Sequence, residues 1–164
     1  MALLRRPITE AALERVFRTR YEALARMATT ITGDVERGHD AVQEGFTRAL
    51  RASASFRGEA AVESWVWRIV LRAAVDERSG PVDAPLPEST AVALPFPDRD
   101  PELAAAVAAL APRRRLIVFL RYYADLDLRQ IAAVVGVAEG TVSATLVQAH
   151  DVLRERLLTT RETR

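Results

Sequence analysis

The stretch that decides the fold is "LRQIAAVVGVAEGTVSATL", which runs from Leu128 to Leu146. Its pattern is that of a helix-turn-helix, in which a small residue lies where two helices cross and a turn residue follows. Ala132 is the small residue, and Gly136 comes four positions later as the turn. An alanine-rich helical hairpin that only packs would be the plainer interpretation. We favour a DNA-binding motif because both special positions coincide.

The second helix of this motif has no positive charge. Between Gly136 and His150 the only formally charged residue is Glu139. An apolar stripe from Val142 to Leu157 should face the protein. That leaves five small or polar residues facing outward, where base edges would be: Thr141, Ser143, Ala144, Thr145 and Gln148. The helix can therefore discriminate bases, but it offers nothing that attracts a polyanion.

The composition is that of a soluble, folded protein, with 49% apolar and 27% charged residues in 164. No run of about twenty apolar residues exists and the N-terminus does not fit a signal peptide, so we expect a cytoplasmic protein. The chain has no Cys, its two histidines (His39 and His150) fall in separate parts, and no Gly-rich phosphate loop is present. These features argue against an enzyme, and we expect no catalytic residue, metal or cofactor.

Six of the eight prolines lie between Pro81 and Pro101, which predicts a linker. Helical periodicity on both sides predicts an all-α fold of two small helical domains joined by this Pro-rich linker. The expected parts are a first domain at 1–79, a flexible linker at 80–99 and a second domain at 100–164. The expected helices are 9–32, 35–52, 62–78, 101–110, 113–123, 128–135 and 139–158.

The third expected helix contains two tryptophans. Trp65 falls on its apolar stripe, together with Val62, Val66 and Ile69. Trp67 lies about 200° further round the helix. We therefore expect Trp65 in the core and Trp67 to be the more exposed of the two.

Two long segments resemble one protein family. The segment "LAPRRRLIVFLRYYADLDLRQIAAVVGVAEGTVSATLVQAHDVLRERL" is similar to region 4 of extracytoplasmic-function (ECF) sigma factors of bacterial RNA polymerase, in the sigma-70 superfamily. The segment "GHDAVQEGFTRALRASASFRGEAAVESWVWRIVLRAAVDERSG" is similar to their region 2, a three-helix bundle. Both appear in the family's order and together cover nearly the whole chain.

The resemblance implies two sites in region 2. Its second helix would dock on core polymerase through residues spaced to share one face: Asp40, Gln43, Glu44 and Arg48. Without the resemblance, this would be read as an ordinary solvated face with a Glu44–Arg48 pair. A loop and the third helix would melt and hold the minus-ten element through Phe56, Arg57, Gly58, Trp67, Arg68 and Arg72.

The sequence departs from the family pattern in both DNA-facing helices. Many members carry "RN" where this chain has Leu71–Arg72, and "TVKSRLHRA" where it has "TVSATLVQA". Asp76 follows one turn later and can pair with Arg72. Phosphate contact at the minus-thirty-five element then falls to arginines outside the reading helix: Arg113, Arg114, Arg115, Arg121 and Arg129. With a net charge of only +1, the isolated protein should bind duplex DNA weakly or not at all.

The resemblance implies an alternative sigma factor that directs promoter recognition and transcription initiation, with strand opening at the minus-ten element. Its partners would be core RNA polymerase and promoter DNA. The family commonly uses an anti-sigma factor, and the sequence leaves open whether this chain has one. Two other functions stay open: a sigma-like protein that docks without productive promoter binding, and a free-standing helix-turn-helix regulator.

Overall fold

The computed structural model describes residues 8–56, 61–79 and 100–162, and every element within them is helical. The prediction of an all-α fold is therefore confirmed. The linker predicted at 80–99 lies outside the described residues, so the proposed domain boundaries stay predictions. The elements are α1 (Glu10–Thr32), α2 (Val35–Ala52), the short 3-10 helix η1 (Ser53–Ser55), α3 (Val62–Ser79), α4 (Pro101–Ala108), α5 (Pro112–Tyr122), α6 (Leu128–Val135) and α7 (Glu139–Glu162).

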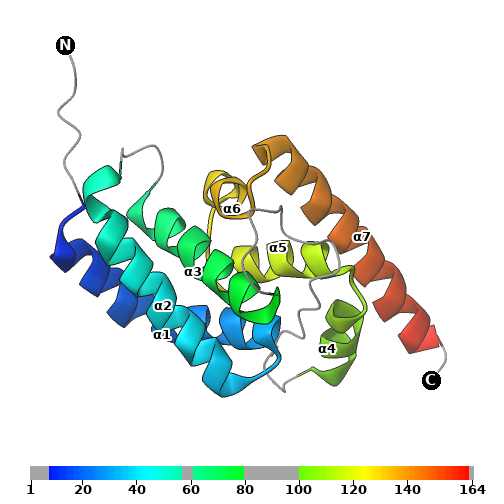
Figure 1. The fold of residues 1–164 in the computed structure, drawn as a ribbon. Coiled ribbons are helices and arrows are strands. Elements are labelled where there is room, and N and C mark those ends of the chain that lie inside the picture. The colour runs from blue at the N-terminus through cyan, green and yellow to red at the C-terminus, as the bar shows by residue number, and fades with distance from the viewer. Residues whose placement is uncertain (1–7, 57–60, 80–99, 163–164) are drawn as a thin grey trace, which may run out of the picture.

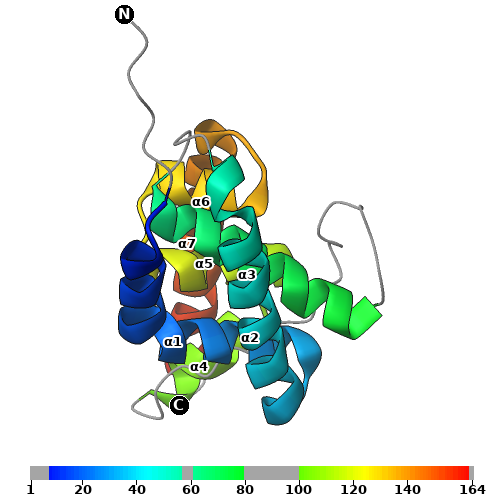
Figure 2. The same ribbon diagram turned by 60° about the vertical axis from the view of Figure 1, so that its left-hand side comes forward.

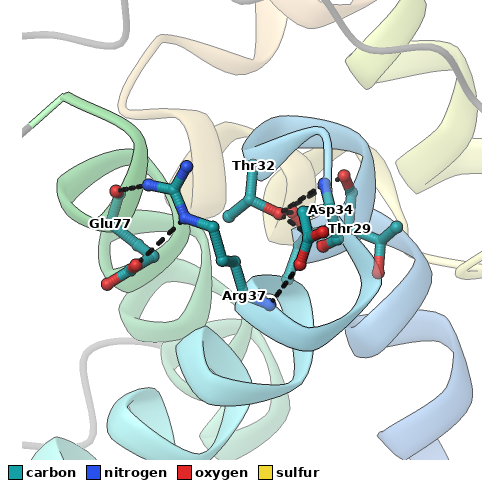
Figure 3. A network of polar contacts seen from close by, with 6 residues as sticks. Thr29, Thr32, Asp34, Arg37 and Glu77 are labelled. Atoms are coloured by element: carbon teal, nitrogen blue, oxygen red, sulfur yellow. Dashed lines mark hydrogen bonds and ion pairs between the residues drawn. The ribbon is translucent and has the colours of Figure 1, made fainter.

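A tight turn joins α1 to α2 and is stabilised by capping at both helix ends (Figure 3). Gly33 ends α1 in the left-handed conformation, with φ of 77°, and its N–H donates to the Thr29 carbonyl over 2.8 Å. Asp34 begins α2 by accepting from the Arg37 N–H over 2.9 Å. The Arg37 side chain reaches Glu77 near the end of α3, with 3.2 Å between Nε and Oε1. The turn is thereby tied to the third helix as well.

Helix α3 lies between the α1–α2 pair and the C-terminal helices (Figures 1 and 2). It packs against α1, α2 and α6. At 100° per residue, its buried residues span an arc of about 200°, about twice the stripe of a helix packed on one side. They are Ser64, Val66, Trp67, Val70, Leu71, Ala73, Ala74 and Val75. The buried residues of the two halves form one continuous core.

The expected exposures of the two tryptophans were wrong. Trp67 has 0% of its surface exposed, whereas Trp65 is only partly buried. The ring of Trp65 lies against Phe56, with 5.2 Å between centroids. The prediction assumed that α3 has one packed face. Because α3 is packed on more than one side, a position about 200° from the apolar stripe is also buried.

The close approach of α2 and α3 depends on Gly45. A Cβ at this position would lie 2.7 Å from Cγ2 and 2.9 Å from Cα of Val70. Because the obstacle includes backbone, Gly45→Ala should force the helices apart and lower the free energy of unfolding by about 1–3 kcal/mol. Urea denaturation measures this difference.

A matched control is Gly140→Ala in α7, where an added Cβ meets no heavy atom within 4 Å. This change should leave stability unaltered or raise it by up to about 1 kcal/mol. Equal unfolding free energies for the two variants would contradict the close packing of α2 on α3.

Candidate functional site

The turn between α6 and α7 has the geometry of a helix-turn-helix. Gly136 ends α6 with φ of 75°, and its N–H donates to the Ala132 carbonyl over 2.9 Å. Ala132 itself is buried. The two helices are bent by 103°, within the range of about 90–120° typical of the motif. The predicted motif is thus confirmed.

Among the described residues, no single helix has the length and apolar character needed to cross a membrane, although α6 and α7 taken together meet that test.

The start of α6 is fixed by a capping box that was not predicted. Asp127 Oδ1 accepts from the Gln130 N–H over 2.7 Å, and Gln130 Oε1 accepts from the Asp127 N–H over 2.8 Å. The spacing D-x-x-Q before an apolar run is its sequence signature.

Arg121, expected to contact phosphate, donates from Nη1 to the Leu126 carbonyl over 3.0 Å and thereby holds the loop that precedes α6.

The structure groups three of the five predicted base-reading residues. Thr141, Ala144 and Gln148 are exposed and recur at i, i+3 and i+7, so they share one face of α7. Ser143 is exposed as well but points about 100° or more away from them. Thr145 is half-buried, and its hydroxyl donates to the Thr141 carbonyl over 2.7 Å. Of the five candidate residues, only these three are therefore both exposed and on one face of α7.

One predicted phosphate contact lies directly beside this surface. Nη2 of Arg114, at the start of α5, donates to Oε1 of Gln148 over 3.0 Å. The guanidinium of Arg114, from another helix, thus lies beside the uncharged face of α7 that carries these candidate residues. Arg129 is exposed in the first turn of α6, and Arg113 is half-buried.

Arg115 has a structural role in the fold. Its Nη2 donates to the Leu110 carbonyl over 2.8 Å and also to the Ala108 carbonyl, at the end of α4. Burial lowers the pKa of its guanidinium from the ordinary value. Arg115 therefore ties the end of α4 and the loop after it to α5, a role that the sequence pattern did not indicate.

Three of the four residues predicted to form a docking face on α2 are exposed, and the fourth is turned toward α3. Asp40, Gln43 and Glu44 are all exposed. Arg48 is directed toward α3, where its Nη1 lies 2.6 Å from Oδ2 of Asp76, while its Nε lies 2.8 Å from Oε1 of Glu44. Hydrogen bonds to Asp76 and Glu44 raise the pKa of Arg48 further. Asp76 thus binds Arg48, and its expected pairing with Arg72 stays a prediction.

The residues predicted to hold the minus-ten element are not all available. Phe56 is half-buried against Trp65 at the end of η1. Trp67 is in the core, so it cannot act as an exposed ring. Arg57 and Gly58 lie outside the described residues.

The two arginines of α3 line a cavity that faces α6. Arg68 is exposed and Arg72 half-buried. The cavity measures about 500 Å³, and its other walls come from α2, α3 and α6: Arg48, Ile69, Asp76, Val134 and Gly136. The proposed DNA-facing side of α3 therefore adjoins the helix-turn-helix.

Comparison with known proteins identifies both halves. The family model described as Sigma-70 region 2 matches residues 16–80, and the one described as Sigma-70, region 4 matches residues 101–150. The ECF RNA polymerase sigma factor SigM of Mycobacterium tuberculosis is 32% identical over 148 residues, covering 84% of this chain and 73% of SigM. The chain belongs to the family of ECF RNA polymerase sigma factors.

Other sigma factors show a similar extent of likeness. SigL of Mycobacterium tuberculosis is 31% identical over 161 residues, covering 88% of this chain and 89% of SigL. SigV of Bacillus subtilis is 27% identical over 137 residues, covering 80% and 82% of the two chains. The sigma factor RpoE, in a crystal structure with the anti-sigma factor NepR from Bartonella quintana, shares the fold. Its TM-score is 0.60 at 19% identity, over 88% of this chain and 95% of RpoE.

In terms of the sigma family, region 2 extends from within α1 to the end of α3, and region 4 from α4 into α7. The α3–α6 contact is therefore a contact between region 2 and region 4. The cavity lined by Arg68 and Arg72 lies at this contact.

Proposed function

We propose that this sigma factor brings bacterial core RNA polymerase to promoters in the cytoplasm and opens the DNA strands at the minus-ten element. The observation that carries the proposal is the presence of both sigma regions in one chain, each with an exposed polar surface. Region 2 would provide docking and strand opening, and region 4 would read the minus-thirty-five element. No step requires the protein to carry out a covalent reaction itself.

Docking would use the exposed face of α2. The carboxylates of Asp40 and Glu44, with the amide of Gln43 beside them, suit charge-assisted hydrogen bonds from arginines of a partner. Arg48 contributes indirectly, because its contacts with Glu44 and Asp76 fix the carboxylate of Glu44 and join α2 to α3.

Reading of the minus-thirty-five element would use the Thr141–Ala144–Gln148 face of α7. A threonine hydroxyl and a glutamine amide can bond base edges, and the alanine methyl can contact a thymine methyl. Arg114 lies beside Gln148 and would contact the adjacent phosphate. Because polymerase would provide most of the affinity for DNA, one arginine beside this face is sufficient for the local phosphate contact.

Strand opening would use the loop after α2 together with α3. Phe56, half-buried against Trp65, would provide an aromatic surface on which a flipped base can stack. Arg68 and Arg72 lie one turn apart on α3 and would hold the phosphates of the separated strand. The family's Asn position is Arg72 here, so base reading at this point would differ from that of many relatives.

A reconstituted transcription assay tests the function. Core polymerase with this protein should initiate at defined start sites in a library of promoter fragments, whereas neither component should do so alone. Binding to core without defined starts would contradict the proposal and favour a protein that docks without promoter binding. Tight, sequence-specific binding to duplex DNA by the protein alone would favour a free-standing regulator.

A further inference from the structure

The exposed side of α7 carries a regular stripe of residues that the proposed promoter contacts do not use. Helix α7 lies at the edge of the molecule and packs against α4, α5 and α6 (Figure 1). Four exposed residues follow one another along it at steps of four, three and four: Val147, Asp151, Arg154 and Leu158. This is the heptad spacing of the seam along which two helices pair. We call these four residues the α7 seam.

The two ends of the α7 seam are large apolar side chains in contact with water. Val147 is 57% exposed and Leu158 is 54% exposed. Single exposed apolar residues are common on protein surfaces, but these two lie on one seam, about 16 Å apart along the helix. A second helix laid along the seam would remove both from water.

The middle of the α7 seam carries one charge of each sign. Oδ1 of Asp151 and Nη1 of Arg154 lie 3.5 Å apart, and such an exposed pair contributes little to α7 itself. A parallel copy of α7 would place each of these charges against its own equivalent. An antiparallel copy places Asp151 opposite the second copy's Arg154, and Val147 opposite the second copy's Leu158. The seam is therefore complementary in charge to itself when the two helices run antiparallel.

The residues on the two edges of the α7 seam agree with this pairing. Antiparallel order brings Gln148 near the second copy's Glu155, and an amide can donate to a carboxylate there. On the other edge it brings His150 near the second copy's Leu157, which is half-buried. Neither edge thus places like charges of these residues against each other.

We propose that a second copy of this chain packs antiparallel on the α7 seam and forms a dimer with two-fold symmetry. The contact is one pair of helices, so the dimer is weak and forms at high protein concentration. Ala144 lies three residues before Val147 and continues the seam, and Gln148 is on its edge. The second copy therefore covers two of the three residues on the Thr141–Ala144–Gln148 face. The dimer cannot read the minus-thirty-five element, a consequence that rests on the proposed function.

Charge-reversal variants test the α7 seam without polymerase or DNA. Asp151→Arg leaves only cations in the middle of the seam, and Arg154→Asp leaves only anions. Each variant alone should raise the dissociation constant of the dimer at least about 10-fold. An equimolar mixture of the two should associate again, because opposite charges then meet across the seam. Sedimentation equilibrium over a range of protein concentrations measures these constants.

The matched control is Glu14→Arg, which reverses one charge of an exposed ion pair on α1. It should dimerise as the unmodified chain does, and circular dichroism should show equal helicity in all variants. A chain that stays monomeric at every concentration overturns the proposal. A mixture that associates no better than the separate variants overturns it as well. Seam substitutions that weaken binding to core polymerase, in a chain that does not dimerise, would make polymerase the occupant instead.

Disulfide formation tests the antiparallel order. The chain has no native Cys, so Val147→Cys and Leu158→Cys chains can be mixed and mildly oxidised. The mixed disulfide should dominate, because antiparallel order brings these two positions together and keeps equal positions about 16 Å apart. A preference for disulfides between equal positions would overturn the antiparallel seam.

The same cross-linked dimer separates failure of the inference from failure of the function. With core polymerase it should not initiate transcription, and reduction of the disulfide should restore initiation. Initiation by the cross-linked dimer would overturn the proposed block of reading. Absence of initiation by the unmodified chain would contradict the proposed function, whereas the sedimentation result would still decide whether the dimer forms.

Discussion

Replacing Glu44 by Lys is expected to abolish stable binding to core RNA polymerase. Glu44 is exposed on α2, between the other two exposed docking residues and Arg48. A lysine there would face the cations proposed on the partner and would also repel Arg48. Reversing one charge of a close interfacial pair costs about 2–5 kcal/mol, which corresponds to a loss of about 30- to several-thousand-fold in affinity. Fluorescence anisotropy with labelled protein measures the dissociation constant.

The control for this variant is Glu22→Lys, which makes the same charge change at an exposed position of α1. It should bind core as tightly as the unmodified protein. Thermal unfolding of both variants shows whether loss of the Glu44–Arg48 contact has disturbed the fold. If Glu44→Lys retains its affinity for core, the docking face has been assigned to the wrong side of α2.

Trp67→Ala is expected to have the largest effect on stability. The side chain is the largest among those fully buried, and removing it leaves a cavity within a core that both halves share. The expected loss in the free energy of unfolding is about 3–5 kcal/mol. Trp65→Ala, at a partly buried position, should cost clearly less. Urea unfolding followed by far-ultraviolet circular dichroism compares the two variants, because fluorescence would change with either substitution.

The order of these two effects is decisive. A larger destabilisation by Trp65→Ala than by Trp67→Ala would mean that Trp65 is the core residue, as the apolar periodicity predicted. It would contradict the packing of α3 on more than one side.

Local signals in the sequence were sufficient to place the helices. Gly33 and Asp34 mark one helix end and the next start, and Gly136 marks the end of α6. Each acts through backbone conformation or capping within a few residues, so its effect can be predicted without tertiary contacts. The expected bounds of α2 and α6 are those of the structure.

Side-chain roles that depend on tertiary contacts could not be predicted. Arg48 and Arg114 each bond a residue at least 28 positions away in the sequence, and local spacing carries no information on such pairs. Arg115 and Arg121 have nearer acceptors, but these are backbone carbonyls, which every sequence offers. Trp67 is buried because α3 packs against several other helices, which the sequence of α3 alone does not show. The sequence was therefore sufficient to place the helices, whereas the contacts of their side chains required the structure, and the binding roles of the candidate residues stay predictions.

With the proposed minus-ten contacts on α3, the wide buried arc of this helix limits how promoter preference can be redesigned. A helix with one packed face offers most of its circumference to substitution, so new base contacts can be tried at little cost to folding. On α3, most alternatives to Arg68 and Arg72 as contact positions already belong to the core. A library of variants aimed at new minus-ten sequences should therefore vary Arg68, Arg72 and Phe56, and leave the rest of α3 unchanged.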